Sequence, residues 1–104
     1  MRRLLKQLAA QALLFDGQRQ ETFVVQFQTS CLNLAMKNVS PGQLYVFVLK
    51  QDAKGNHTLT WGSEMRNAML LDPAPNSVTV QCFIGMPGNF LQANIPGTWT
   101  EEAP

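Results

Sequence analysis

The side chain best suited to acid–base chemistry is His57, the only histidine of the chain. A metal site with several histidines is therefore excluded, and a Ser-His-Asp or Cys-His arrangement would have to be built around this residue. His57 follows a predicted turn and alternates with Leu59 and Trp61, which is typical of a strand residue. No neighbouring residue in the sequence has the usual setting of a catalytic nucleophile. We expect His57 to have a structural role.

The acidic residues that precede the C-terminal tail are scattered along the chain: Asp16, Glu21, Asp52, Glu64 and Asp72. Several fall in predicted turns, where an Asp side chain caps backbone N–H groups. A glycosidase would need two of them across a cleft, and a chain of 104 residues has little scaffold for one. The glycines lie at β-turns rather than in a phosphate-binding loop. We therefore predict a non-enzymatic protein with no catalytic, cofactor-binding or metal-binding residues.

Cys31 and Cys82 are the only cysteines. Their long separation matches neither a CxxC redox pair nor a zinc cluster. Two buried thiols in a reduced compartment and a disulfide are both compatible with the sequence, because Cys also packs as a small hydrophobic residue.

Charge gives little support to nucleic-acid or membrane binding. Eight Lys and Arg against seven Asp and Glu leave a formal net charge of +1, which is too small for a field that holds phosphates. No stretch approaches the roughly 18 to 20 apolar residues that span a bilayer. The basic, leucine-rich start imitates a secretory signal, but Lys6, Gln7 and Gln11 interrupt it. We expect a soluble protein that binds neither nucleic acid nor membrane.

The elements that must position any surface begin with residues 1–20, which we expect to form either a short helix or an extended arm. Leu5, Leu8 and Leu13 recur at helical spacing there, with polar residues largely on the other side. A helix of this length is marginal alone, so it would have to dock on its own sheet or on a partner.

Residues 21–95 are predicted to form one β domain, followed by a tail over 96–104. The run 23–27 alternates, residues 44–49 are apolar on both faces, and 57–61 follow a turn, so we expect the last two runs to form a hairpin. Residues 62–77 contain prolines and should be a loop. Further short strands at 78–84 and 90–93 favour a mainly β fold, a small antiparallel β-sandwich or a jelly-roll-like domain.

Two features could serve protein contacts. Apolar side chains in the predicted loop must fold back on the core or meet another subunit, and aromatic and Met side chains are enriched in the centres of interfaces. The oppositely charged ends are either solvated or meet on neighbouring subunits. The candidate interface residues are Arg2, Arg3, Lys6, Met65, Met69, Leu70, Trp99, Glu101 and Glu102.

The segment from Tyr45 to Gly62 resembles a pattern of tailed-bacteriophage virion proteins. In that pattern an apolar strand ends in Gln-Asp, here Gln51-Asp52, a turn with Gly follows, and a Thr-rich strand ends in Trp. A proline-containing loop and an aromatic strand residue, here Phe83, come next. The likeness covers roughly residues 20 to 93, and it implies a small β module of tail fibres, tail tips or head-associated proteins, without catalytic residues to carry over.

A single short module suits an accessory subunit, so the resemblance implies first of all a capsid decoration (cement) protein that bridges neighbouring subunits of the major capsid protein. The alternatives are a tail fibre, tail-tip or baseplate module and a carbohydrate-binding β module, for which only Trp61 and Tyr45 are available. We expect a homo-oligomer, with a trimer favoured, that binds another virion structural protein and is assembled in the host cytoplasm.

Overall fold

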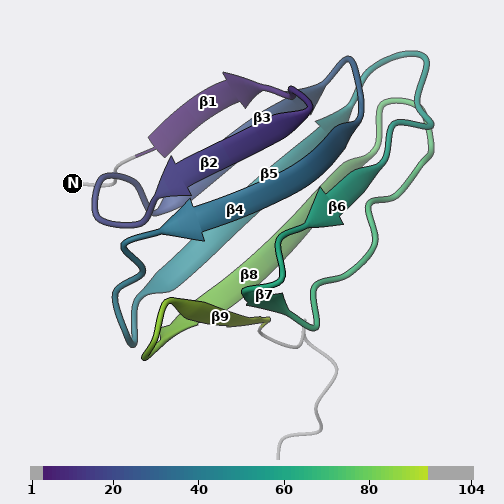
Figure 1. The fold of residues 1–104 in the computed structure, drawn as a ribbon. Helices are drawn as coiled ribbons and strands as arrows, with labels where there is room; N and C mark the ends of the chain where they lie inside the picture. Colours follow the sequence, from purple (N-terminus) through teal and green to yellow (C-terminus); the bar gives the residue numbers. More distant parts are fainter. Residues whose placement is uncertain (1–3, 94–104) are drawn as a thin grey trace, which may run out of the picture.

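The computed structural model describes residues 4–93, which form two β-sheets facing each other (Figure 1). One sheet has six strands in the order β1-β3-β5-β8-β9-β7, and the other has three in the order β2-β4-β6. The described part contains no helix. Its strands are β1 (Leu4–Leu8), β2 (Ala12–Asp16), β3 (Thr22–Phe27), β4 (Cys31–Lys37), β5 (Leu44–Gln51), β6 (Leu59–Trp61), β7 (Met65–Arg66), β8 (Val78–Met86) and β9 (Phe90–Ala93).

The first six strands alternate between the two sheets, so that each consecutive pair forms one rung of a short stack. In Figure 1, β2, β4 and β6 lie in front of β1, β3 and β5. Neighbouring rungs pair in parallel in both sheets. The register places Leu5 beside Phe23 and Phe23 beside Phe47, while Leu13 lies beside Leu34 in the other sheet. Each rung thus adds its apolar residues to the same interior columns.

Antiparallel strands complete the six-stranded sheet. β8 pairs with β5, and β9 pairs with β8. The turn between β8 and β9 contains Gly88 at φ 86° and Asn89 at φ 63°, and tight hairpins need such left-handed residues because they match the strand twist. β7 then pairs with β9 in parallel.

Aromatic rings from both sheets fill the interior. Phe23 and Phe47 of the six-stranded sheet stack with centroids 4.8 Å apart, and Phe15 of β2 stacks on Phe23 at the same distance. Trp61 of β6 meets Phe47 edge-on at 5.3 Å and Phe83 at 5.2 Å. Offset and edge-to-face contacts of this kind stabilise a core beyond the burial of area. The cluster therefore fastens the three-stranded sheet to the six-stranded one.

The prediction of a mainly β fold is confirmed, but the six-stranded sheet is mixed and the three-stranded sheet is parallel, rather than both being antiparallel. The hairpin predicted between residues 44–49 and 57–61 is wrong, because β5 and β6 lie in different sheets. The segment 52–58 instead crosses from the six-stranded sheet to the three-stranded sheet. Two strands of one sheet that are separated by such crossings, such as β3 and β5, can run parallel. Residues 62–77 are a loop as predicted, apart from the short strand β7.

Of the two conformations expected for residues 1–20, a short helix or an extended arm, the helix is not formed in the described part, where residues 4–8 and 12–16 are the strands β1 and β2. Pairing with β3 and β4 supplies the backbone hydrogen bonds that a marginal helix would otherwise make. Leu13 and Phe15, two residues apart, are both buried, which is the spacing of a strand. The tail over 96–104 lies outside the described residues.

Truncation of Phe47 tests the importance of the aromatic cluster. Phe47 is fully buried and contacts rings of both sheets, so Phe47→Ala should lower the free energy of unfolding by about 3–5 kcal/mol in urea titrations. The control is Val48→Ala on the same strand, where the half-buried side chain points away from the core and the loss should be about 1 kcal/mol or less. Equal losses at the two positions would contradict the assignment of the core.

Candidate protein-binding surface

The side of the six-stranded sheet that faces away from the three-stranded sheet is largely apolar. Tyr45, Phe47 and Leu49 of β5 point into the core, so the residues between them point outward. β8 alternates in the same way. We call the resulting surface the outer face, and its central apolar residues are Leu44, Val46, Val48, Val78, Val80, Cys82 and Ile84.

These residues are neighbours across paired strands and remain accessible. Val48 lies opposite Val80, and Leu44 lies opposite Ile84. Val78 is 56% exposed and Val80 is 50% exposed. A contiguous apolar patch of this kind is uncommon on an isolated domain and marks a surface for protein contact. The outer face is therefore the candidate interaction site of the described structure.

Only basic charges accompany these apolar residues. The six strands of this sheet carry Lys6, Lys50 and Arg66 and no Asp or Glu. The Arg66 guanidinium lies 4.2 Å from the centre of the Phe90 ring, a cation–π contact at the β9 end of the sheet. The outer face would therefore favour a partner that brings carboxylates to its border.

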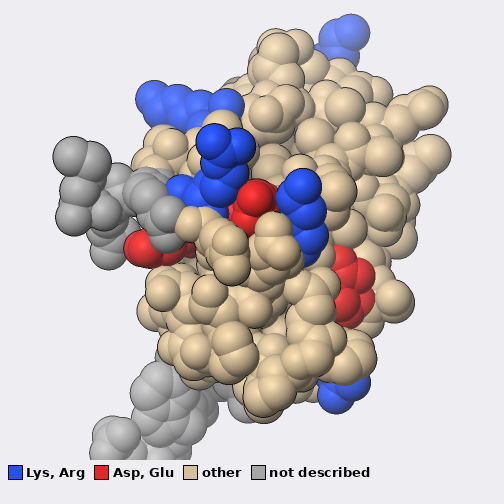
Figure 2. All heavy atoms as spheres, turned by 60° about the vertical axis from the view of Figure 1, so that its left-hand side comes forward, with Lys and Arg blue, Asp and Glu red and all other residues tan. Residues whose placement is uncertain are grey.

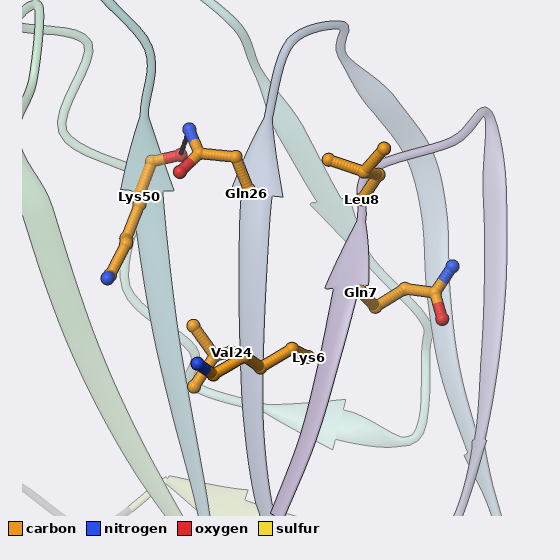
Figure 3. A pocket seen from close by; sticks show the side chains of 6 residues that line it. All are labelled: Lys6, Gln7, Leu8, Val24, Gln26 and Lys50. Atoms are coloured by element: carbon orange, nitrogen blue, oxygen red, sulfur yellow. Dashed lines mark hydrogen bonds between the residues drawn. The ribbon is translucent and has the colours of Figure 1, made fainter.

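A shallow hollow of about 260 Å³ lies at the β1 end of the outer face (Figure 3). Figure 3 shows Lys6 reaching across Val24 and Lys50 extending along β5, so that two ammonium groups border the same hollow. The Gln26 side-chain amide donates a hydrogen bond to the Lys50 carbonyl over 3.3 Å. Among the described residues neither lysine forms an ion pair. With respect to residues 4–93, both ammonium groups remain available to a carboxylate.

On the side of the molecule shown in Figure 2, charges do not gather by sign. Acidic side chains lie among the basic ones there. That side therefore lacks the continuous basic field that phosphate backbones require.

Within residues 4–93 no helix is long and apolar enough to cross a membrane, and no group of three or more His, Cys, Asp or Glu side chains could hold a metal ion.

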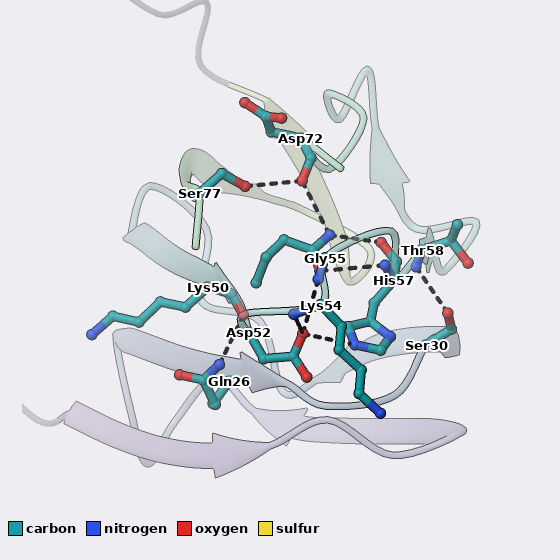
Figure 4. Close-up of polar contacts among 11 residues, drawn as sticks. Gln26, Ser30, Lys50, Asp52, Lys54, Gly55, His57, Thr58, Asp72 and Ser77 are labelled. Carbon is teal, nitrogen blue, oxygen red and sulfur yellow. Dashed lines mark hydrogen bonds and ion pairs between the residues drawn. The ribbon is translucent and has the colours of Figure 1, made fainter. Parts of the chain in front are cut away.

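The polar residues around His57 organise the crossing from β5 to β6 (Figure 4). Asp52 Oδ1 accepts hydrogen bonds from the Lys54 and Gly55 amides at 3.1 and 3.0 Å, and it lies 3.1 Å from His57 Nε2. The buried Gln51 side chain donates to the His57 carbonyl at 2.8 Å. The contacts of His57 thus tie it to the loop, which accords with the structural role expected from the sequence.

The Asp52 carboxyl is stabilised in its ionised form by these contacts. Burial alone would raise the pKa of Asp52, but hydrogen bonds from the Gly55 amide and the His57 ring outweigh it and hold the pKa below its usual value.

The structure separates the residues that the sequence offered as an interface. Lys6 borders the outer face, whereas Met65 is 6% exposed and belongs to the core. Met69 and Leu70 lie in the loop after β7, and Leu70 is 88% exposed. The remaining candidates fall outside the described residues: Arg2, Arg3, Trp99, Glu101 and Glu102.

Sequence analysis missed the outer face, although its signal was present. The run 44–49 is apolar on both faces, as noted from the sequence, and it forms β5 in the interior of the six-stranded sheet. The three-stranded sheet covers one side only.

The cysteines are free, with Cys31 buried and Cys82 half-buried. The aromatic rings offered to a carbohydrate are also engaged, because Tyr45 is fully buried and Trp61 packs on Phe47 and Phe83.

Replacing Asp52 tests the loop and its dependence on pH. Because the pKa of Asp52 is lower in the folded chain, its ionised form stabilises the fold above the unfolded pKa, and this contribution is lost as the pH falls through the folded pKa. Asp52→Ala should therefore unfold at a lower urea concentration than wild type at about pH 7, with a gap that shrinks below about pH 4. Asp52→Asn keeps an acceptor oxygen and should lose less. A gap independent of pH would contradict this account.

The model of the family described as "Putative phage tail fibre C-terminal domain" matches residues 17–88. This segment includes β3 to β8, and therefore most of the outer face, and it leaves β1 and β2 outside. Searches of curated proteins and of solved structures found no match. The match confirms the resemblance to tailed-phage virion proteins and makes the chain a structural component of the virion. Because it spans more than half of the sequence, the chain belongs to the family of phage tail fibre C-terminal domains.

Proposed function

We propose that this chain is a non-enzymatic module of a phage tail fibre and that it binds another virion protein through its outer face. The observation that carries the proposal is the exposed apolar surface of β5 and β8, centred on Val48 and Val80. The match to a phage tail fibre domain family supports this proposal, because the modules of a fibre must be joined to other subunits.

The chemistry of the outer face defines its partner. Burial of apolar area supplies the driving force, at about 25 cal/mol per Å² removed from water. Lys6, Lys50 and Arg66 border the apolar centre. We therefore expect a protein surface with an apolar centre and carboxylates at its border, since complementary charges at the rim of an interface fix orientation and speed association.

A role at the tail replaces the capsid decoration that the sequence first favoured. A fibre domain family supports the tail alternative better than a cement protein that bridges subunits of the major capsid protein. The partner is then a neighbouring fibre or tail protein. Homo-oligomerisation and assembly in the host cytoplasm remain parts of the proposal.

The position in the virion can be measured directly. Antibodies against the purified domain, applied to intact phage and viewed by electron microscopy, should label the distal or proximal fibres of the tail. Labelling of heads in saturable, icosahedral numbers would overturn the tail assignment and restore the decoration hypothesis.

A charge in the centre of the outer face tests the surface itself. Val80→Glu places a carboxylate on an exposed strand position, so the isolated domain should fold normally, while its incorporation into tails should fall at least about tenfold because the charge would be buried without a partner. The matched control is Thr60→Glu, an exposed position on β6 in the other sheet. Incorporation of both variants at the wild-type level would refute the assignment of the outer face.

A further inference from the structure

The chain leaves β9 beside a stretch of β8 that no described strand pairs with on that side. β9 pairs with residues 83–86 of β8 and ends at Ala93. Because β9 runs antiparallel to β8, its direction carries the chain from Ala93 along residue 82 toward Val78. This stretch of β8 contributes the exposed Val78 and Val80 to the outer face. The residues after β9 therefore start next to the apolar centre of that face.

The sequence after β9 prevents the strand from simply continuing along β8. In the register of the two strands, residue 96 falls opposite Val80, and residue 96 is a proline. Proline has no backbone N–H to donate to a neighbouring strand, and the pair Pro96-Gly97 is typical of a turn. We therefore expect the chain to leave the edge of β8 at this point.

The inner side of β8 is already occupied there. The Met69 amide donates a hydrogen bond to Gln81 Oε1 at 2.8 Å, and the Asp72 amide donates to Thr79 Oγ1 at 3.3 Å. Gln81 and Thr79 are buried, so the loop after β7 covers β8 on the side that faces the three-stranded sheet. A segment that turns away from the edge of β8 therefore finds accessible apolar surface on the outer face.

The composition of residues 94–104, which we call the acidic segment, is complementary to the outer face. The six strands that form this sheet carry basic residues and no Asp or Glu. The acidic segment carries Trp99, Glu101 and Glu102 and no Lys or Arg. An aromatic ring packs on apolar surface, and carboxylates at the border of a contact are attracted to ammonium groups.

We propose that the acidic segment folds back across the outer face of its own chain. The Trp99 ring then packs on the exposed valines, and the two carboxylates lie at the hollow that Lys6 and Lys50 border (Figure 3). The segment shields the outer face in the free chain, and a virion partner binds by displacing it. Only this displacement rests on the proposed function, because the fold-back concerns the chain by itself.

The distances allow this placement within one chain. Lys50 lies opposite Val78, and Ala93 lies opposite Phe83 on the other side of β8. With a rise of about 3.3 Å per residue and about 4.8 Å between strands, Ala93 and Lys50 are roughly 19 Å apart. The stretch from Ala93 to Glu101 spans at most about 26 Å when extended. The segment of the same chain is also present at a higher effective concentration than that of a second copy.

The thiol of Cys82 reports whether the outer face is covered. Cys82 lies on β8 within this face and is half-buried by the described residues alone, whereas Cys31 is buried in the core. In the full chain Cys82 should react slowly with a maleimide, and Trp99→Ala should raise the rate about tenfold because the anchor of the segment is lost. The matched control, Thr100→Ala, should react at the wild-type rate. Equal rates for wild type and Trp99→Ala would overturn the proposal, and labelling of Cys31, followed by peptide mass, would reveal any unfolding.

Charge reversal tests the contact at the hollow. Reversing both acidic residues, Glu101→Lys with Glu102→Lys, should raise the labelling rate of Cys82 about three- to tenfold at low ionic strength. Adding Lys6→Glu and Lys50→Glu should restore slow labelling, because opposite charges meet again. Lys37→Glu, on β4 of the other sheet, should not restore it. Equal restoration by Lys37→Glu would show an effect of net charge and would contradict the contact.

Cross-linking distinguishes the same chain from a second copy. In a Cys82→Ser background, which leaves only the buried Cys31, Lys50→Cys combined with Glu101→Cys should give an internally linked monomer with a short bismaleimide, identified by peptide mass. Lys37→Cys combined with Glu101→Cys should stay unlinked. A linked dimer would assign the segment to a second copy, and no link at all would leave the outer face uncovered; either result overturns the proposal. Because the cross-link is measured on the isolated chain, its failure is distinguishable from failure of the outer face to bind a virion partner.

Discussion

The rings of Phe23 and Phe47 stack with centroids 4.8 Å apart. This contact requires the parallel register of β3 and β5, and the packing of the two sheets requires this contact. From the three-stranded sheet, Phe15 stacks on Phe23 and Trp61 contacts Phe47 edge-on. The aromatic column holds only if each rung crosses to the second sheet and returns in register. The loops that cross from one sheet to the other are therefore as necessary to the core as the strands.

Polar side chains stabilise these crossing loops by hydrogen bonds, because strand pairing does not extend into the loops. In the crossing from β5 to β6, the Gln51 side-chain amide donates to the His57 carbonyl and the Asp52 carboxylate accepts from the Gly55 amide. The Glu64 carboxylate likewise accepts from the Met36 amide at 2.8 Å. Side-chain groups that satisfy backbone amides in this way let a small domain make sharp crossings without unpaired polar groups. The residues with the greatest capacity for chemistry are thereby engaged in structure.

The same architecture leaves one face of the six-stranded sheet uncovered by the described strands. The three-stranded sheet covers only one side of β5 and β8, so the valines of the outer face remain exposed. Among the described strands, β1 and β2 are the terminal strands of the two sheets. The proposed binding of another virion protein rests on this exposed apolar face.

The sequence by itself determined that the chain is mainly β, that residues 62–77 form a loop, and that the segment around Gln51 and Asp52 belongs to a phage virion protein. These features depend on local alternation, on prolines and on a recognisable order of residues. Only the tertiary structure decided that β1 and β2 are strands, that most strand pairs are parallel, and that Val48 faces outward while Met65 is buried. Strand partners come from distant parts of the chain, so a local pattern cannot tell which side of an apolar strand another sheet will cover.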